Sequence, residues 1–199
     1  DRELWIVRRL ARELRGNRPG CHFVVADAAR LPFRAEVFDH IAVLDVLEHV
    51  PEEERAAREI ETALAPGGSV SFFGPAAHWR FPYHRWMRPL ALPESQVLDL
   101  WGHRRRGYSP KDLELLFPHC DGEGFVAYQE AEEGWRIDVE HSRLPFPLKI
   151  VFWWLGERYY RLMRSRQSTC DRLSFGVRLR KRGDGVTRHV AAAAGGERA

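Results

Sequence analysis

The stretch FDHIAVLDVLEHVPEEERAAREIETALAPGGSVSFF (Phe38–Phe73) decides the fold of this 199-residue chain. Phe38–Leu44 and Ser69–Phe73 are short apolar runs, which predict buried strands. Between them, Pro51 and three glutamates open a helix, because proline fits a first helical turn and carboxylates suit the positive end of the helix dipole. Pro66 and two glycines then end that helix. Strand, helix and strand in this order predict an α/β fold, with a parallel sheet covered on both faces.

Further elements extend outward from this unit. An apolar run just before Asp27 predicts another buried strand, and apolar residues at helical spacing predict an amphipathic helix near the start. Ser109 and Pro110 form a helix start, with the serine as cap. The expected ranges are a helix over 2–15, strands over 22–26, 125–128 and 174–179, an aromatic helix over 149–166, and a disordered tail over 183–199.

Residues 74–107 lack any periodicity and are rich in aromatic residues, arginine, histidine and proline. A connection this long inside a compact domain is typically a lid, a binding loop or a short helical insert. We therefore expect one domain over 1–182, with an aromatic insert at 74–107 and an aromatic, basic helical insert at 145–170.

Charge and cysteine content exclude several classes of protein. The net charge is +3, but residues 1–156 carry net −4 and residues 157–199 carry net +7. No apolar run has the length of a membrane span, and no signal peptide is found, so a cytoplasmic protein is expected. Cys21, Cys120 and Cys170 lie far apart, which excludes a disulfide scaffold, and no metal site is predicted.

Ligands of open α/β sheets bind beyond the carboxyl ends of the strands. The residues that follow the predicted strands are therefore the candidates for a site. ADAARLPF (26–33) follows the first strand, DVLEHV (45–50) the second, and the aromatic insert the third.

Three of these segments, in order, resemble a known family. ADAARLPF, FDHIAVLDVLEHV and LAPGGSVSF are similar to class I S-adenosylmethionine-dependent methyltransferases, in the branch of the ubiquinone and menaquinone biosynthesis enzymes. WGHRRRGYSPKDLELLF (101–117) and GFVAY (124–128) extend the resemblance to about residue 130. It implies a Rossmann-like sheet, S-adenosylmethionine as cofactor, and methyl transfer to a small or lipid-like molecule.

The resemblance also implies roles for single residues. Asp27 would accept a hydrogen bond from the adenine amino group, and the backbone of Ala28 would contact the ring. Leu44 and Asp45 would lie under the methionine part of the cofactor, and Glu48 and His49 would line the substrate side as catalytic candidates. Asp27 as the cap of a turn, Glu48 as part of an acidic first turn and His49 as a structural histidine are the alternatives.

The family's glycine-rich turn after its first strand is not found before Asp27. The sequence thus indicates an N-terminally truncated methyltransferase sheet, with the first two strands absent and a C-terminal aromatic helical insertion. Asp1 then stands where the family binds the ribose hydroxyls, or it is only a helix cap. A degenerate, non-catalytic module that binds a protein or a membrane surface is the alternative function.

The aromatic residues offer two further predictions. Candidate substrate residues of the first insert are Tyr83, His84, Trp86 and Trp101, which could equally fill a core. Aromatic residues are mixed with arginines over 149–166, a pattern that suits peripheral contact with anionic lipid, a dimer, or packing across the end of the sheet. No nucleic-acid motif is found, so no nucleic-acid partner is expected.

Overall fold

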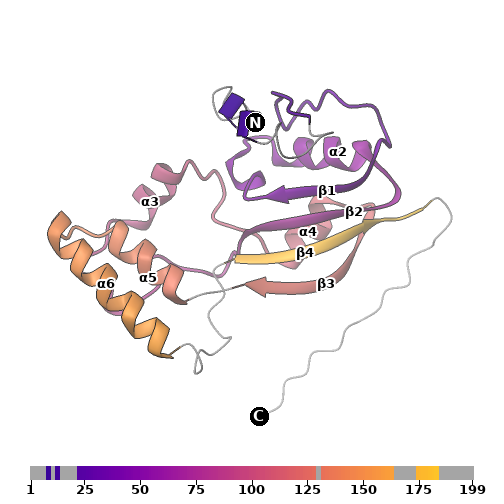
Figure 1. Ribbon diagram of the computed structural model, residues 1–199. Helices are drawn as coiled ribbons and strands as arrows, with labels where there is room; N and C mark the ends of the chain where they lie inside the picture. Colours follow the sequence, from indigo (N-terminus) through magenta and orange to yellow (C-terminus); the bar gives the residue numbers. More distant parts are fainter. Residues whose placement is uncertain (1–7, 10–11, 14–21, 129–130, 164–173, 184–199) are drawn as a thin grey trace, which may run out of the picture.

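The computed structural model describes residues 8–9, 12–13, 22–128, 131–163 and 174–183 (Figure 1). The predicted helix over 2–15 and the predicted tail lie mostly outside these residues, as does Asp1. The strands are β1 (Phe38–Leu44), β2 (Leu64–Pro75), β3 (Cys120–Tyr128) and β4 (Ser174–Lys181). The α-helices are α2 (Glu53–Ala63), α3 (Glu94–Trp101), α4 (Pro110–Leu116), α5 (Ala131–Glu140) and α6 (Phe146–Met163), with short 3-10 turns η1 (Leu47–His49) and η2 (Arg85–Met87).

The four strands form one sheet in the order β1-β2-β4-β3. β1 and β2 are parallel, as expected of a strand, helix and strand unit, with Val43 opposite Phe72. β4 runs antiparallel to both of its neighbours. The α/β class and the strands at 38–44, 69–73, 125–128 and 174–179 are confirmed, whereas the expectation of a purely parallel sheet is wrong.

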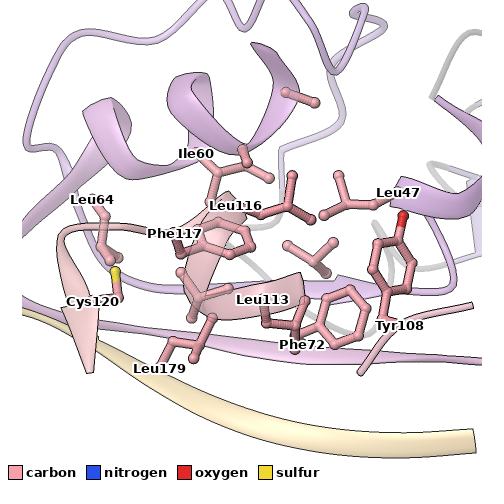
Figure 2. Packing of buried hydrophobic residues seen from close by; sticks show 14 of the residues in the cluster. Leu47, Ile60, Leu64, Phe72, Tyr108, Leu113, Leu116, Phe117, Cys120 and Leu179 are labelled. Atoms are coloured by element: carbon pink, nitrogen blue, oxygen red, sulfur yellow. The ribbon is translucent and has the colours of Figure 1, made fainter. Parts of the chain in front are cut away.

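One face of the sheet carries the main hydrophobic core, which Figure 2 shows. Alternate residues of β1, β2 and β4 point to this face, and α2 and α4 cover it with Ile60, Leu113 and Leu116. The rings of Phe72 and Tyr108 pack edge to face at 5.2 Å between centroids. On the opposite face His40, Ala42 and Arg178 are exposed, so the prediction of a sheet covered on both faces fails there.

The helix starts follow the local sequence. Ser109 caps α4 through a reciprocal pair of bonds with Asp112, and Pro110 occupies the first turn, as predicted. α2 begins at Glu53, two residues after Pro51, and buries Ala56, Ala57 and Ile60 at helical spacing.

The predicted strand at 22–26 is absent. Val24 and Val25 are each 45% exposed, and among the described residues only an isolated bridge from Asp27 to Arg30 follows this segment. A strand forms only where a neighbour accepts and donates its backbone hydrogen bonds. No described strand lies beside residues 22–26, so the apolar run stays extended without joining the sheet.

Residues 77–107 and 131–163 together form a second unit, here called the helical insert. It contains α3, α5 and α6, which group beyond the carboxyl ends of β1, β2 and β3 (Figure 1). Two backbone hydrogen bonds, from the Ala77 N–H to the Tyr108 carbonyl and from the Tyr108 N–H to the Pro75 carbonyl, join the two ends of its first segment. The two predicted inserts therefore pack on each other through a small cluster around Trp135, and a second cluster around Trp79 joins the first insert to α5.

α6 confirms the helix expected over 149–166 as far as Met163, but it does not lie across the sheet. It packs on α5 through Phe152 and Gly156, and most of its other large apolar side chains are exposed. No helix within the described ranges is long and apolar enough to cross a membrane.

Candidate functional site

A cavity of about 250 Å³ opens at the carboxyl ends of β1 and β2, where the sheet meets the helical insert. We call it the strand-end pocket. Its lining combines acidic, imidazole and aromatic side chains: Asp45, Glu48, His49, Phe73, Pro75, Trp79, Tyr83, Trp101, His103, Glu133, Ile137 and Ser174.

The exit from β1 positions the acidic side of this pocket. Asp45 has a positive φ of 48°, a conformation that aspartate tolerates better than most residues. Its backbone N–H donates to the carbonyl of Phe73 at 2.9 Å, which ties the exit to β2. The η1 turn follows, and Leu47 is fully buried in the main core. Glu48 and His49 are thereby held at the end of the strand.

Glu48 is the most deeply buried carboxyl group of the pocket, with 1% of its surface exposed. Its Oε2 atom is buried without a hydrogen-bond partner. Burial raises the pKa of Glu48 to about 7, and the neighbouring Asp45 carboxyl, with which it shares a hydrogen bond, adds to the rise. Burial also raises the pKa of Asp45. The two carboxyl groups therefore form a pair that readily holds a proton or another cation.

Two histidines complete the polar wall. The Glu48 carbonyl accepts the backbone N–H groups of Arg104 at 2.7 Å and Arg105 at 3.3 Å, which brings the loop after α3 against η1. His49 Nδ1 lies 3.3 Å from the Gly102 carbonyl oxygen. The rings of His49 and His103 lie 4.8 Å apart between centroids, nearly perpendicular to each other. Burial lowers the pKa of His103 to about 4, so this imidazole is neutral at physiological pH.

Aromatic side chains form the other wall. Trp79 stacks on Tyr83 at 5.3 Å between ring centroids and lies 6.0 Å from Trp101. Burial raises the pKa of Tyr83, so its hydroxyl stays protonated. Two of the predicted substrate residues, Tyr83 and Trp101, thus lie in the same pocket as Asp45, Glu48 and His49.

The other two, His84 and Trp86, line a different cavity of about 370 Å³ between α5 and α6. We call it the insert pocket. His84 Nδ1 lies 2.8 Å from the fully buried Asp138, and His84 Nε2 lies 2.6 Å from the hydroxyl of Tyr160. The four predicted residues are therefore divided between two cavities.

The cofactor residues expected further upstream lie outside both linings. The Asp27 carboxylate accepts the backbone N–H of Ala29 at 3.1 Å, as an aspartate in a turn does. Ala28 packs against the main core, and Leu44 is 59% exposed at the end of β1. Asp1 lies outside the described residues.

The sequence did not indicate that His103, Trp79, Glu133, Ile137 and Ser174 belong to the site. His103 and Trp79 stand in the aromatic stretch 74–107, which was predicted as a binding loop, but nothing in their spacing separates them from their neighbours. Glu133, Ile137 and Ser174 come from the second half of the chain. Glu133 and Ile137 reach the pocket through the packing of α5, and Ser174 reaches it because β4 pairs with β2, opposite Pro75.

In comparisons with known proteins, the amino-terminal third of the chain is similar to a protein family. Residues 6–72 match the family described as "Methyltransferase domain". The mouse protein named "Probable tRNA methyltransferase 9B" is 32% identical over 114 residues, which are 48% of this chain and 25% of that protein. The chain therefore spans about a quarter of the length of this curated relative.

Solved structures share the fold over most of the chain. A candidate sarcosine dimethylglycine methyltransferase from Galdieria sulphuraria superposes with a TM-score of 0.58 at 12% identity, over 92% of this chain and 68% of that chain. The N-methyltransferase NodS from Bradyrhizobium japonicum, solved with S-adenosyl-L-homocysteine, gives 0.53 at 16% identity, over 91% and 64%. The chain has a Rossmann-like methyltransferase fold, and residues 6–72 are similar in sequence to the methyltransferase domain family.

Proposed function

We propose that this chain belongs to an S-adenosylmethionine-dependent methyltransferase and that the strand-end pocket is where the methyl donor meets the acceptor. One observation carries the proposal. Asp45, Glu48 and His49, which follow the strand of the family segment, line one cavity with three neighbouring aromatic rings, those of Trp79, Tyr83 and Trp101. In open α/β sheets this edge is where ligands bind.

The residues of the pocket fit a cationic methyl donor. The sulfonium of S-adenosylmethionine carries a positive charge, which carboxylates and aromatic faces both attract. Asp45 and Glu48 supply the carboxyl groups, and Trp79 and Trp101 supply the faces. The cofactor delivers an activated methyl group, so the task of these side chains is to orient the two reactants and exclude water.

The remaining cofactor contacts stay predictions from the resemblance. Asp27 and Ala28 would hold the adenine, Leu44 would lie beneath the methionine part, and Asp1 would hold the ribose. The order of the three motifs supports the ubiquinone and menaquinone branch.

His49 is the proposed general base. With Nδ1 donating to the Gly102 carbonyl, Nε2 carries the lone pair and can take a proton from an acceptor. The pKa of the Glu48 carboxyl is raised by burial, and this group would stabilise the positive charge that develops on His49 when it takes the proton. The aromatic wall of Tyr83, Trp79 and Trp101 supports a small or lipid-like acceptor.

The binding of S-adenosyl-L-methionine, which carries the sulfonium charge, is measured by calorimetry and tests this proposal. We expect the chain to bind it and Asp45→Asn to bind about tenfold more weakly, a loss of about 1.4 kcal/mol. Asparagine tolerates the same positive φ, so the exit from β1 is kept. Asp39→Asn, an exposed carboxylate on β1, is the matched control. If both variants bind the ligand equally well, the ligand does not bind beside Asp45. If the unaltered chain does not bind it, the non-catalytic module is favoured.

We also propose that α6 makes peripheral contact with an anionic membrane surface. Nine large apolar side chains of this helix are between 46% and 79% exposed: Phe146, Leu148, Ile150, Val151, Trp153, Trp154, Leu155, Tyr159 and Leu162. Arg158 and Arg161 are exposed on the same helix, and Arg158 lies over the ring of Trp154. Aromatic residues with arginines are typical of helices that lie in a membrane interface.

Cosedimentation with vesicles that contain anionic phospholipid tests this contact. We expect binding that falls with salt and is lost in Trp153→Glu, while Leu115→Glu, at an exposed leucine of α4, binds as the unaltered chain does. If vesicles do not retain the protein at low salt and ultracentrifugation shows a dimer, α6 is a dimer interface instead.

A further inference from the structure

We propose that Glu48, His49 and His103 form a binding site for a divalent transition-metal ion in the strand-end pocket. One ligand atom from each residue lies within 4.8 Å of the other two. Ligands on a single ion of this kind stand about 2.0–2.2 Å from it, so two of them are separated by roughly 3–4 Å. A small side-chain adjustment brings the three atoms to that spacing.

Two atoms of this cluster lack a partner that an ion would supply. Glu48 Oε2 and His103 Nδ1 are both buried without a hydrogen bond. No lysine or arginine among the described residues forms an ion pair with Glu48, although it is 1% exposed. A buried polar atom left unpaired is costly, so a site that gathers two of them calls for a ligand.

The surroundings already hold the three side chains in place. The two backbone bonds from the 104–105 loop to the Glu48 carbonyl fix His103 beside η1. The bond between His49 Nδ1 and the Gly102 carbonyl leaves Nε2 with its lone pair, and metal-binding histidines commonly donate their other N–H to a backbone carbonyl in this way. Gly102 itself has a φ of 71°, and it closes α3 so that the loop turns back toward His49.

The donor set selects the class of ion. Two imidazoles and one carboxylate suit zinc, cobalt or iron(II), whereas magnesium and calcium prefer oxygen ligands. Three protein ligands leave a position open for a small molecule. Asp45, hydrogen-bonded to Glu48, would orient the ligating carboxylate.

The use of the ion rests on the proposed function, but its binding does not. An acceptor hydroxyl bound to such an ion loses its proton more easily than a free one. The ion would then replace His49 as the group that activates the acceptor, and the pocket would favour an oxygen nucleophile.

Direct metal binding tests the site without any methyl transfer. The purified chain is stripped with a chelator and titrated by calorimetry with Zn²⁺, and the visible spectrum is recorded with Co²⁺. We expect one ion per chain and a cobalt spectrum typical of nitrogen and oxygen ligands. His103→Ala and Glu48→Gln should each weaken Zn²⁺ binding by about a hundredfold or more.

His119→Ala is the matched control, because His119 is exposed and precedes β3 at the opposite end of the sheet. It should bind Zn²⁺ as the unaltered chain does. Circular dichroism identifies any variant that fails to fold. Absence of a stoichiometric ion in the unaltered chain, or equal binding by His103→Ala and the control, would overturn the proposal. S-adenosyl-L-methionine binding, measured separately, shows whether the methyltransferase proposal stands or falls independently.

Discussion

The sheet with its two helices and the helical insert bury apolar residues in different ways. In the sheet, residues of all four strands and of two helices form one continuous cluster, with Phe72, Phe117 and Val70 almost fully buried. In the insert, two smaller clusters form around Trp79 and Trp135, and α6 leaves much of its apolar surface exposed.

This difference in burial suggests that the sheet region carries most of the folding stability and that the insert governs the choice of substrate. A continuous core supports cooperative unfolding, whereas a helix held along one side can detach at lower free energy. The strand-end pocket lies where the sheet meets the helical insert. Asp45 and Glu48 come from the sheet region, whereas the aromatic wall comes from the insert. We expect the chemistry to depend on the first and the choice of substrate on the second.

Phe72→Ala should have the largest effect. It removes a ring that is 1% exposed and packs against Tyr108, so the free energy of unfolding should fall by about 3–5 kcal/mol. Urea unfolding followed by circular dichroism measures the change. A loss below about 1 kcal/mol would show that the sheet core is no better packed than the insert.

Gly156→Ala should destabilise the helical insert and leave the stability of the sheet unchanged. An added methyl group would collide with the Trp135 ring, which is buried and donates to the Phe152 carbonyl. Overpacking of this kind costs about 1–3 kcal/mol. Hydrogen exchange should show faster exchange in α5 and α6 and unchanged protection in β1 and β2. If protection falls equally in both regions, they unfold as one unit.

Asp112→Asn should weaken the sheet region by a smaller amount and in a pH-dependent way. Burial alone would raise the pKa of Asp112, but hydrogen bonds from Ser109 and Arg105 outweigh it and hold the pKa below its usual value. The carboxylate therefore stabilises the fold at neutral pH, and this contribution is lost as the pH falls through the lowered pKa. We expect a loss of about 1 kcal/mol at pH 7 that shrinks in acid. Urea unfolding at pH 7 and pH 3 checks it, and an equal difference at both would contradict it.

Leu162→Ala should have the smallest effect. This side chain of α6 is 79% exposed, so its removal should change the free energy of unfolding by less than about 0.5 kcal/mol. Thermal unfolding of the isolated chain measures it. A larger loss would mean that this face of α6 is covered in solution.

The strands and helices were predictable where local signals were complete. The apolar runs around Val43 and Phe72, and the helix start at Ser109 and Pro110, specify their elements without help from distant residues. Val24 and Val25 carry the same apolar signal, yet they form no strand, because a strand also needs a partner that a local pattern cannot supply.

The candidate site shows the same division. Asp45, Glu48 and His49 follow β1 directly, so the sequence alone placed them at a ligand edge. His84 and Trp86 come from the same aromatic stretch as Tyr83 and Trp101, and nothing in the sequence separates the two pairs. The turn around η2 directs His84 and Trp86 into the insert pocket. Composition identifies an aromatic region but not the direction in which each side chain points.

The sequence by itself determined the α/β class, the succession of strand, helix and strand over residues 38–73 and the acidic end of β1, because these depend on apolar runs and on neighbours along the chain. Only the tertiary structure decided that His103 meets Glu48 and that α6 keeps an open apolar face. His103 and Glu48 are distant in sequence, and the backbone bonds of the 104–105 loop join them only after the insert has packed. Contacts of that kind depend on how whole elements pack, which no local pattern encodes.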